Sequence, residues 1–150
     1  MKWWDPQKST AGDTRTQQTS TAVEKRKYTK RRKVYVAGPI TGVEDYQLAF
    51  DAVSTALEAH GVRPVSPAGA PEGLTYREYI DRGLRLLGGC EAICLIEGWQ
   101  KSPGAKLERH YAETVGLPVL YAVTRVDKTI RILGIERFLG TRPINPYRWR

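Results

Sequence analysis

A single glutamate, Glu108, stands where an amphipathic helix would be expected to bury apolar surface. The segment from Ser102 to Ala112 opens with Ser-Pro-Gly, which is typical of a helix N-terminus with Ser102 as the N-cap. Residues three and four apart share a helix face, so Glu108 lines up with small neighbours such as Gly104 and Ala112. Removing a carboxylate from water on such a face is costly unless it has a partner or a chemical role. Glu108 is therefore a candidate catalytic group, and a capping or salt-bridged glutamate near the helix start is the alternative.

A glycine-rich turn is the second feature that could belong to a site. It follows the first hydrophobic run of the chain and reads Gly38-Pro39-Ile40-Thr41-Gly42. The turn lacks the G-x-G-x-x-G spacing of dinucleotide-binding proteins, and no Gly-Lys-Ser/Thr follows as in a P-loop. By itself such a turn is weak evidence of a site, so its significance depends on the residues that lie near it.

The strands that must position these two segments are predicted from short hydrophobic runs. The runs lie at residues 34–37, 62–65, 92–96 and 118–123. Pro64 favours an edge position for the second strand, because proline cannot donate a hydrogen bond to a neighbouring strand. The continuous apolar run of the third predicts a central strand that is covered on both faces.

Four helices are predicted between and after the strands. The first ends at Gly61, and the second opens with a capping box formed by Thr75 and Glu78. The third contains Glu108. The fourth is expected to pass through the apolar residues of 130–138.

Strands that alternate with helices predict a small doubly wound α/β domain of the flavodoxin or Rossmann type. Its parallel sheet would have helices on both faces and right-handed crossovers. Ligands of such sheets bind at the carboxyl ends of the strands, where the strand order reverses. The turn 38–42 and the segment 102–108 both follow strands, so we expect them to face one crevice.

The charge of the chain is concentrated at its beginning. Residues 1–33 hold ten Lys and Arg against three acids, and residues 34–150 hold fourteen against thirteen, within a total net charge of +8. We therefore expect a flexible basic tail at 1–32 and one domain at 33–150, and the domain itself has no nucleic-acid signature. The basic run 25–33 is either a solvated leader or a weak contact for nucleic acid or an acidic partner.

The remaining composition predicts a reduced, cytoplasmic protein. Cys90 and Cys94 are expected to be small core residues and not a disulfide. The first residues have no apolar stretch typical of a secretory leader, and no apolar run reaches membrane-spanning length, so we expect neither feature. No histidine pair completes a metal spacing, and no metal or organic cofactor is implied.

The strand and turn 34–42, followed later by Ser102-x-Gly104-x-x-x-Glu108, resemble nucleoside 2-deoxyribosyltransferases and the related nucleoside 5′-monophosphate N-glycosidases. Small phage-type members carry G-P-[IM]-T-G and G-W-x-x-S-x-G-A-x-x-E, which match Gly38 to Gly42 and Gly98 to Glu108. The resemblance covers about residues 33–123.

This resemblance implies roles for individual residues. Glu108 matches the nucleophile that attacks C1′ of the sugar, and Tyr35 matches the tyrosine that orients this carboxylate. Ser102 stands where transferases of free nucleosides carry an aspartate and where the glycosidases carry a phosphate-binding serine. A serine N-cap offers a hydroxyl and backbone N–H groups to phosphate, whereas an aspartate would repel it. The turn 38–42 and Gly104 belong to the expected binding site, and Trp99 would either stack on a base or pack at the rim.

The sequence departs from the glycosidase pattern at two places. Pro39 and Thr41 replace a serine and an arginine that would bind phosphate. Gly83 stands in place of the aspartate expected on the second predicted helix. Asp81 is a candidate substitute, although it lies about 200° away around that helix. The alternatives for protonating the leaving base are Arg77 or no residue at all.

The expected activity is cleavage or transfer of the N-glycosidic bond of a (deoxy)nucleoside 5′-monophosphate, with Glu108, Tyr35 and Asp81 as candidate catalytic residues. The alternative is a catalytically inactive protein that sequesters or senses a nucleotide. A third alternative is an adaptor delivered to nucleic acid by its basic tail. The resemblance also implies a homodimer, with the aromatic and basic end 146–150 as a candidate contact.

Overall fold

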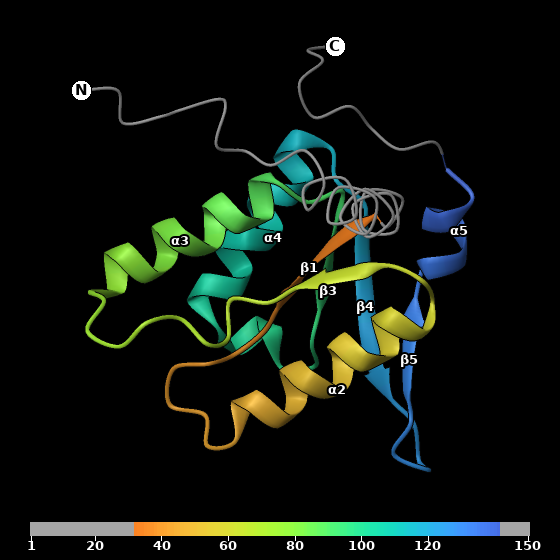
Figure 1. Ribbon diagram of the computed structural model, residues 1–150, viewed down its shortest axis with the longest axis horizontal. Helices are drawn as coiled ribbons and strands as arrows, with labels where there is room; N and C mark the ends of the chain where they lie inside the picture. Colours follow the sequence, from red (N-terminus) through yellow and green to blue (C-terminus); the bar gives the residue numbers. More distant parts are fainter. Residues whose placement is uncertain (1–31, 142–150) are drawn as a thin grey trace, which may run out of the picture. The chain divides into compact units, whose positions relative to one another are not determined.

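The computed structural model describes residues 32–141 (Figure 1). The expected tail before Arg32 and the candidate dimer contact at 146–150 lie outside the described residues. The elements follow in the order β1 (Lys33–Ala37), α2 (Tyr46–Ala59), β2 (Arg63–Val65), α3 (Tyr76–Gly88), β3 (Ala92–Leu95), η1 (Trp99–Lys101), α4 (Pro103–Val115), β4 (Val119–Thr124), β5 (Ile130–Leu133) and α5 (Ile135–Leu139).

The strands form one sheet in the order β2-β1-β3-β4-β5, and the first four run parallel. This confirms the doubly wound α/β fold. β2, which contains Pro64, lies at the edge, and β3 is the fully buried central strand. The chain leaves β1 in one direction to reach β2 and returns on the other side to β3. The strand order therefore reverses between β1 and β3, where such sheets bind their ligands.

Helices cover both faces of the sheet (Figure 1). On one face, α2 and α5 contribute Phe50, Leu57 and Phe138 to a core with side chains from all the strands except β2. On the other face, α3 and α4 pack Leu87 and Ala112 against the opposite side chains of β1 and β3. Successive side chains of a strand point to opposite faces, so β1 sends Tyr35 toward α3 and α4.

Capping side chains fix the starts of the two helices that line the site. The Thr75 hydroxyl accepts a bond from the Glu78 N–H, and the Glu78 carboxylate accepts one from the Thr75 N–H, which confirms the capping box. The Ser102 hydroxyl accepts a bond of 3.2 Å from the Ala105 N–H, and Pro103 occupies the first position of α4. Each helix therefore begins at the residue that the sequence predicts.

The predicted final helix is wrong over its first half. Residues 130–133 form β5, which pairs antiparallel with β4, and only Ile135–Leu139 is helical. Ile132 is buried between two exposed neighbours, which is the period of a strand. Gly134, at φ 88°, then turns the chain into α5. The sheet is therefore mixed at this edge.

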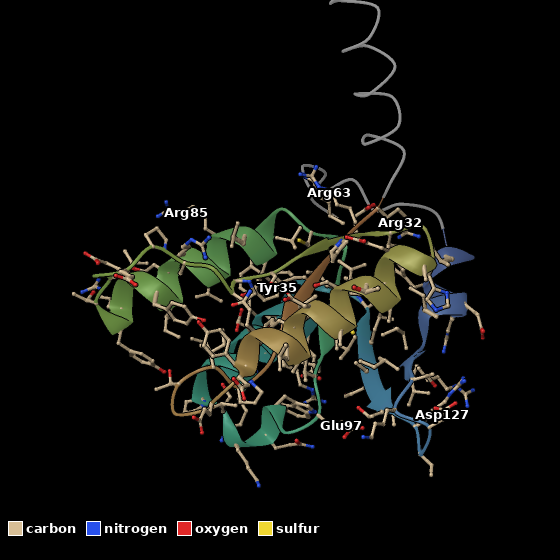
Figure 2. All side chains as sticks on the ribbon, turned by 60° about the horizontal axis from the view of Figure 1, so that its bottom comes forward. Arg32, Tyr35, Arg63, Arg85, Glu97 and Asp127 are labelled. Carbon is tan, nitrogen blue, oxygen red and sulfur yellow. The ribbon has the colours of Figure 1, made fainter. Side chains whose placement is uncertain are left out.

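Arg32, which was predicted to belong to the tail, connects the start of β1 to the end of the described residues. Its guanidinium carbon lies 3.7 Å from the centre of the Phe138 ring, and Nη1 donates to the carbonyl oxygens of Phe138 and Thr141 at 2.7 and 3.1 Å. Nε lies 3.6 Å from Oε2 of Glu91. Figure 2 shows Arg32 beside α5, whereas Tyr35 lies in the interior of the domain.

The structure also bears on the cysteines and on membrane-spanning helices within residues 32–141. Cys90 and Cys94 are buried free thiols, as predicted. Over the same range, the helices are all too short or too polar to cross a membrane.

Candidate active site

Glu108 and Tyr35 bring two polar groups into an otherwise apolar interface between the sheet and α4. Glu108 is 8% exposed, and Tyr35 in β1 is fully buried. Neither Oε2 of Glu108 nor Oη of Tyr35 has a hydrogen bond of ordinary geometry with a described residue. A buried carboxylate oxygen with no partner is costly, so this arrangement is typical of a functional group and not of a structural one.

Burial controls the ionisation of both groups. It raises the pKa of Glu108 from 4.5 to about 7, and the nearby Tyr35 hydroxyl acts in the opposite direction. Burial, followed by the charge of Glu108, raises the pKa of Tyr35 far above its usual value. The tyrosine therefore stays protonated and can donate toward the ionised carboxylate.

Glu108 lines a pocket of about 490 Å³, which we call the Glu108 pocket. Its walls come from the turn after β1, from residues 98 and 101–105 before and at the start of α4, and from α3. Pro67, in the loop between β2 and α3, completes it. The turn and the start of α4 lie at the carboxyl ends of β1 and β3, so the pocket occupies the predicted crevice.

Two glycines permit the close packing around this pocket. A β-carbon at Gly38 would lie 2.9 Å from Cβ of Ile96, so only glycine lets the first turn pass the end of β3. A β-carbon at Gly83 in α3 would lie 3.1 Å from Oη of Tyr35 and 3.3 Å from Oε2 of Glu108. Gly83 thus faces the Tyr35–Glu108 pair directly.

Some of the predicted binding residues line the Glu108 pocket, and others do not. Those that line the Glu108 pocket are Gly38, Pro39, Ile40, Thr41, Ser102 and Gly104.

Gly42 and Trp99 do not line it. Trp99 packs against the core on the α4 face, with the guanidinium carbon of Arg109 4.8 Å from its ring centre. Of the two roles considered for Trp99, stacking on a base or packing, its position here corresponds to packing.

Asp81 lies outside the pocket as well. Its side chain is 58% exposed, and it lies 4.0 Å from Nε of Arg77 on the outer side of α3. Gly83 occupies the buried face two positions later, as the rotation of about 200° between the two positions requires. The structure does not bring Asp81 to Glu108.

Three polar side chains of the pocket were not predicted as site residues. Tyr76 and Tyr79 reach it from the first turns of α3, and Lys101 reaches it from the end of η1. Burial and the charge of Glu108 raise the pKa of Tyr79 to about 12. The position of Lys101 directly before the N-cap of α4 was the available signal, because cations beside helix N-termini favour anions.

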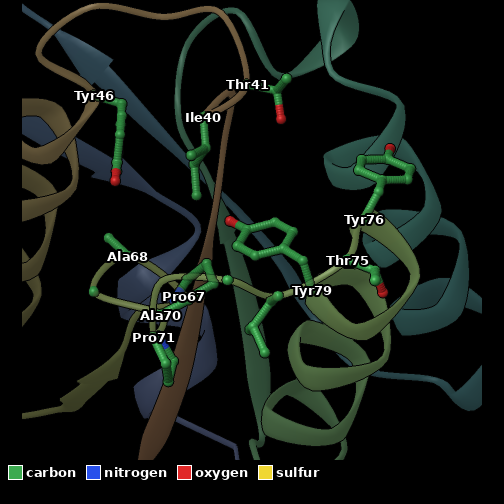
Figure 3. Close-up of a pocket in the computed structure, with 13 residues that line it drawn as sticks. Ile40, Thr41, Tyr46, Pro67, Ala68, Ala70, Pro71, Thr75, Tyr76 and Tyr79 are labelled. Carbon is green, nitrogen blue, oxygen red and sulfur yellow. The ribbon is translucent and has the colours of Figure 1, made fainter.

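A second pocket of about 390 Å³ adjoins the first and shares five lining residues with it, Tyr76 and Tyr79 among them. We call it the tyrosine pocket, because Tyr46 from α2 faces these two tyrosines across it (Figure 3). Its other walls come from the turn after β1 and from the loop 67–75. None of the described residues that line it is charged.

The charged groups of the two pockets are few. Among the described lining residues, Glu108 is the one carboxylate and Lys101 the one cation. Residues 32–141 contain no cluster of His, Cys, Asp and Glu that could bind a metal ion. The arrangement thus offers a single buried nucleophile or acid beside an uncharged aromatic chamber.

Comparison with solved structures identifies the fold. The structure is similar to a 2-deoxyribosyltransferase from Leishmania mexicana, with 16% identity, a TM-score of 0.50 and coverage of 69% of this chain and 80% of that one. It is also similar to a 2-deoxyribosyltransferase from Bacillus psychrosaccharolyticus, with 16% identity, a TM-score of 0.49 and coverage of 77% and 99%. No curated protein matches the sequence.

The chain therefore shares its fold with the Leishmania protein. A family model described as "Domain of unknown function (DUF4406)" matches residues 32–121, which is more than half of the chain. The chain belongs to this family.

Proposed function

We propose that this protein cleaves or transfers the N-glycosidic bond of a (deoxy)nucleoside 5′-monophosphate, with Glu108 as the nucleophile. The observation that carries the proposal is the carboxylate of Glu108, which is buried, lines a pocket and has one oxygen with no hydrogen bond of ordinary geometry among the described residues. Attack by this oxygen on C1′ would form a glycosyl ester, which water or a second base then resolves. Tyr35 would orient the carboxylate by donating its proton toward it.

A phosphorylated substrate is favoured by the groups around the start of α4. The backbone at this helix end carries a partial positive charge, Ser102 offers a hydroxyl, and Lys101 supplies a full charge beside it. No carboxylate of the described residues faces this end of the pocket except Glu108, which would act on the sugar. The phosphate would therefore bind near Ser102, and the base would lie toward the tyrosine pocket.

The test is to incubate the full chain with a panel of nucleoside and deoxynucleoside monophosphates and to measure free base by chromatography. Glu108→Ala and Glu108→Gln should both lose base release, by at least about 10³-fold, because the nucleophile is gone. Glu113→Gln, which alters an exposed carboxylate of the same helix, is the matched control and should retain the activity.

A binding protein without catalysis is the second candidate, and Gly83 favours it because glycosidic chemistry normally uses two carboxylates. In that case calorimetry would detect a nucleotide bound to the wild type and to Glu108→Gln alike, with no base released by either. This outcome would exclude the enzyme.

A further inference from the structure

The proton balance of the site restricts its substrate. When the bond between C1′ and a neutral purine or pyrimidine breaks, the ring nitrogen takes the bonding electron pair, and the base leaves as an anion unless it receives a proton. Enzymes supply this proton from a second acid, which contributes roughly 10²- to 10⁴-fold to the rate. A pair of carboxylates is the usual arrangement.

The described part of this site holds no second carboxylate. Glu108 is the one acidic side chain that lines either pocket. At Gly83, a side chain would begin within 3.3 Å of both Oε2 of Glu108 and Oη of Tyr35, yet this residue has none. The nearest acid in sequence, Asp81, is exposed beside Arg77 on the outer face of α3.

The other proton donors of the pockets do not replace this acid. Tyr79 lies between the two pockets, but its pKa of about 12 makes it a poor donor at neutral pH. Lys101 lines only the Glu108 pocket, next to Ser102, on the side where the phosphate is expected.

We propose, building on the proposed function, that the substrate is a nucleotide whose base is a cationic ring joined through nitrogen, such as a pyridinium. The Glu108 carboxylate attacks C1′, the C1′–N bond breaks, and its electron pair neutralises the ring, which leaves without needing a proton. Water then attacks C1′ of the glycosyl ester. The carboxylate is released, and the proton of the water passes to the solvent.

The tyrosine pocket fits a flat cation better than a neutral base. Tyr46, Tyr76 and Tyr79 line it, and the faces of aromatic rings attract cations. None of the described residues that line it is charged, so no lining charge repels the ring or competes with it. A cation held beside Glu108 also favours the ionised carboxylate, which is the nucleophilic form.

The first experiment compares nicotinamide mononucleotide, whose base is a pyridinium, with adenosine, cytidine and uridine monophosphates and their deoxy forms. Wild-type full-length protein should release nicotinamide with a kcat/KM at least about 100-fold higher than for any neutral base, which is the contribution of the missing acid. Glu108→Gln should abolish this release. If a neutral-base nucleotide is cleaved as fast or faster, the inference is overturned and the proposed function stands. If no nucleotide loses its base, both are overturned.

The second experiment introduces a carboxylic acid at position 83, where the site lacks one. Gly83→Asp should raise the cleavage of neutral-base nucleotides by about 10-fold or more, with a smaller effect on the pyridinium substrate. Gly83→Ala introduces the same crowded β-carbon without the carboxyl group, so it is the matched control. Circular dichroism shows whether each variant is folded. Equal effects of a folded Gly83→Asp on both substrate classes would contradict the leaving-group argument.

Discussion

The raised pKa of Glu108 has opposite consequences for stability and for chemistry. Its ordinary value is 4.5, and burial raises it to about 7 in the folded chain. A group of this kind contributes stability that is fully present below its unfolded pKa and lost as the pH rises through the folded one. The ionised form that would attack a sugar is therefore the form that destabilises the fold.

Glu108→Gln is accordingly expected to stabilise the protein above neutral pH. The gain should be near zero at pH 4 and grow between pH 5 and 8, up to on the order of 3 kcal/mol, which is the full value of the shift. Urea unfolding at several pH values measures it. Glu72→Gln, in an exposed loop, is the control, and a gain independent of pH would contradict the burial argument.

Tyr35→Phe should move the pH profile of catalysis with little loss of stability. The hydroxyl is the one interaction that lowers the pKa of Glu108, so its removal shifts the acid limb of kcat/KM to higher pH. Because Oη has no hydrogen bond of ordinary geometry, the folded state loses little. Tyr121→Phe, which changes a hydroxyl 3.5 Å from Arg109, is the control, and an unmoved limb would exclude Tyr35 as a positioning residue.

At the scale of elements, the start of α4 combines a structural cap with a proposed phosphate site. Ser102 accepts a bond from the Ala105 N–H and also lines the Glu108 pocket. Aspartate caps a helix as well as serine does, but it adds a negative charge. The two roles can therefore be separated by substitution.

Ser102→Asp should leave stability unchanged but raise the KM for a 5′-monophosphate relative to the free nucleoside, by at least about fivefold. This corresponds to about 1 kcal/mol or more of charge repulsion. Ser102→Ala should instead lose about 1 kcal/mol of stability with a smaller change in the KM ratio. Thermal unfolding and initial rates measure both. An unchanged ratio in Ser102→Asp would place the phosphate elsewhere.

The elements with strong local signals were predicted well from the sequence. Capping residues gave the starts of α3 and α4, and Pro64 gave the edge strand. The four residues of β5 were taken for part of a helix, because a strand this short does not show its period clearly. Its pairing with β4 depends on the turn 125–129, where Lys128 has a positive φ of 69°. Lysine rarely adopts a positive φ, so the sequence contains no signal for this turn.

At the scale of the whole molecule, topology explains which part of the site was predictable. The turn after β1 and the start of α4 had to meet, because parallel strands end at one edge of the sheet. The contributions of Tyr79 and Lys101 depend on how α3 tilts and on where η1 ends, and hydrophobic periodicity determines neither. The same holds for the loop 67–75, whose path makes the wall of the tyrosine pocket.

Arg32 joins the start of the described chain to its last helix. Its bonds to Phe138 and Thr141 keep the two ends of the described chain in contact, beside the amino ends of the strands and opposite the Glu108 pocket. Domains whose ends lie close together often tolerate circular permutation, and we expect the same of residues 32–141. A version cut in the exposed turn 125–129 and rejoined through a short linker between 141 and 32 would preserve the strand neighbours. New domains could then be attached at the cut, and the linker would not obstruct the pocket.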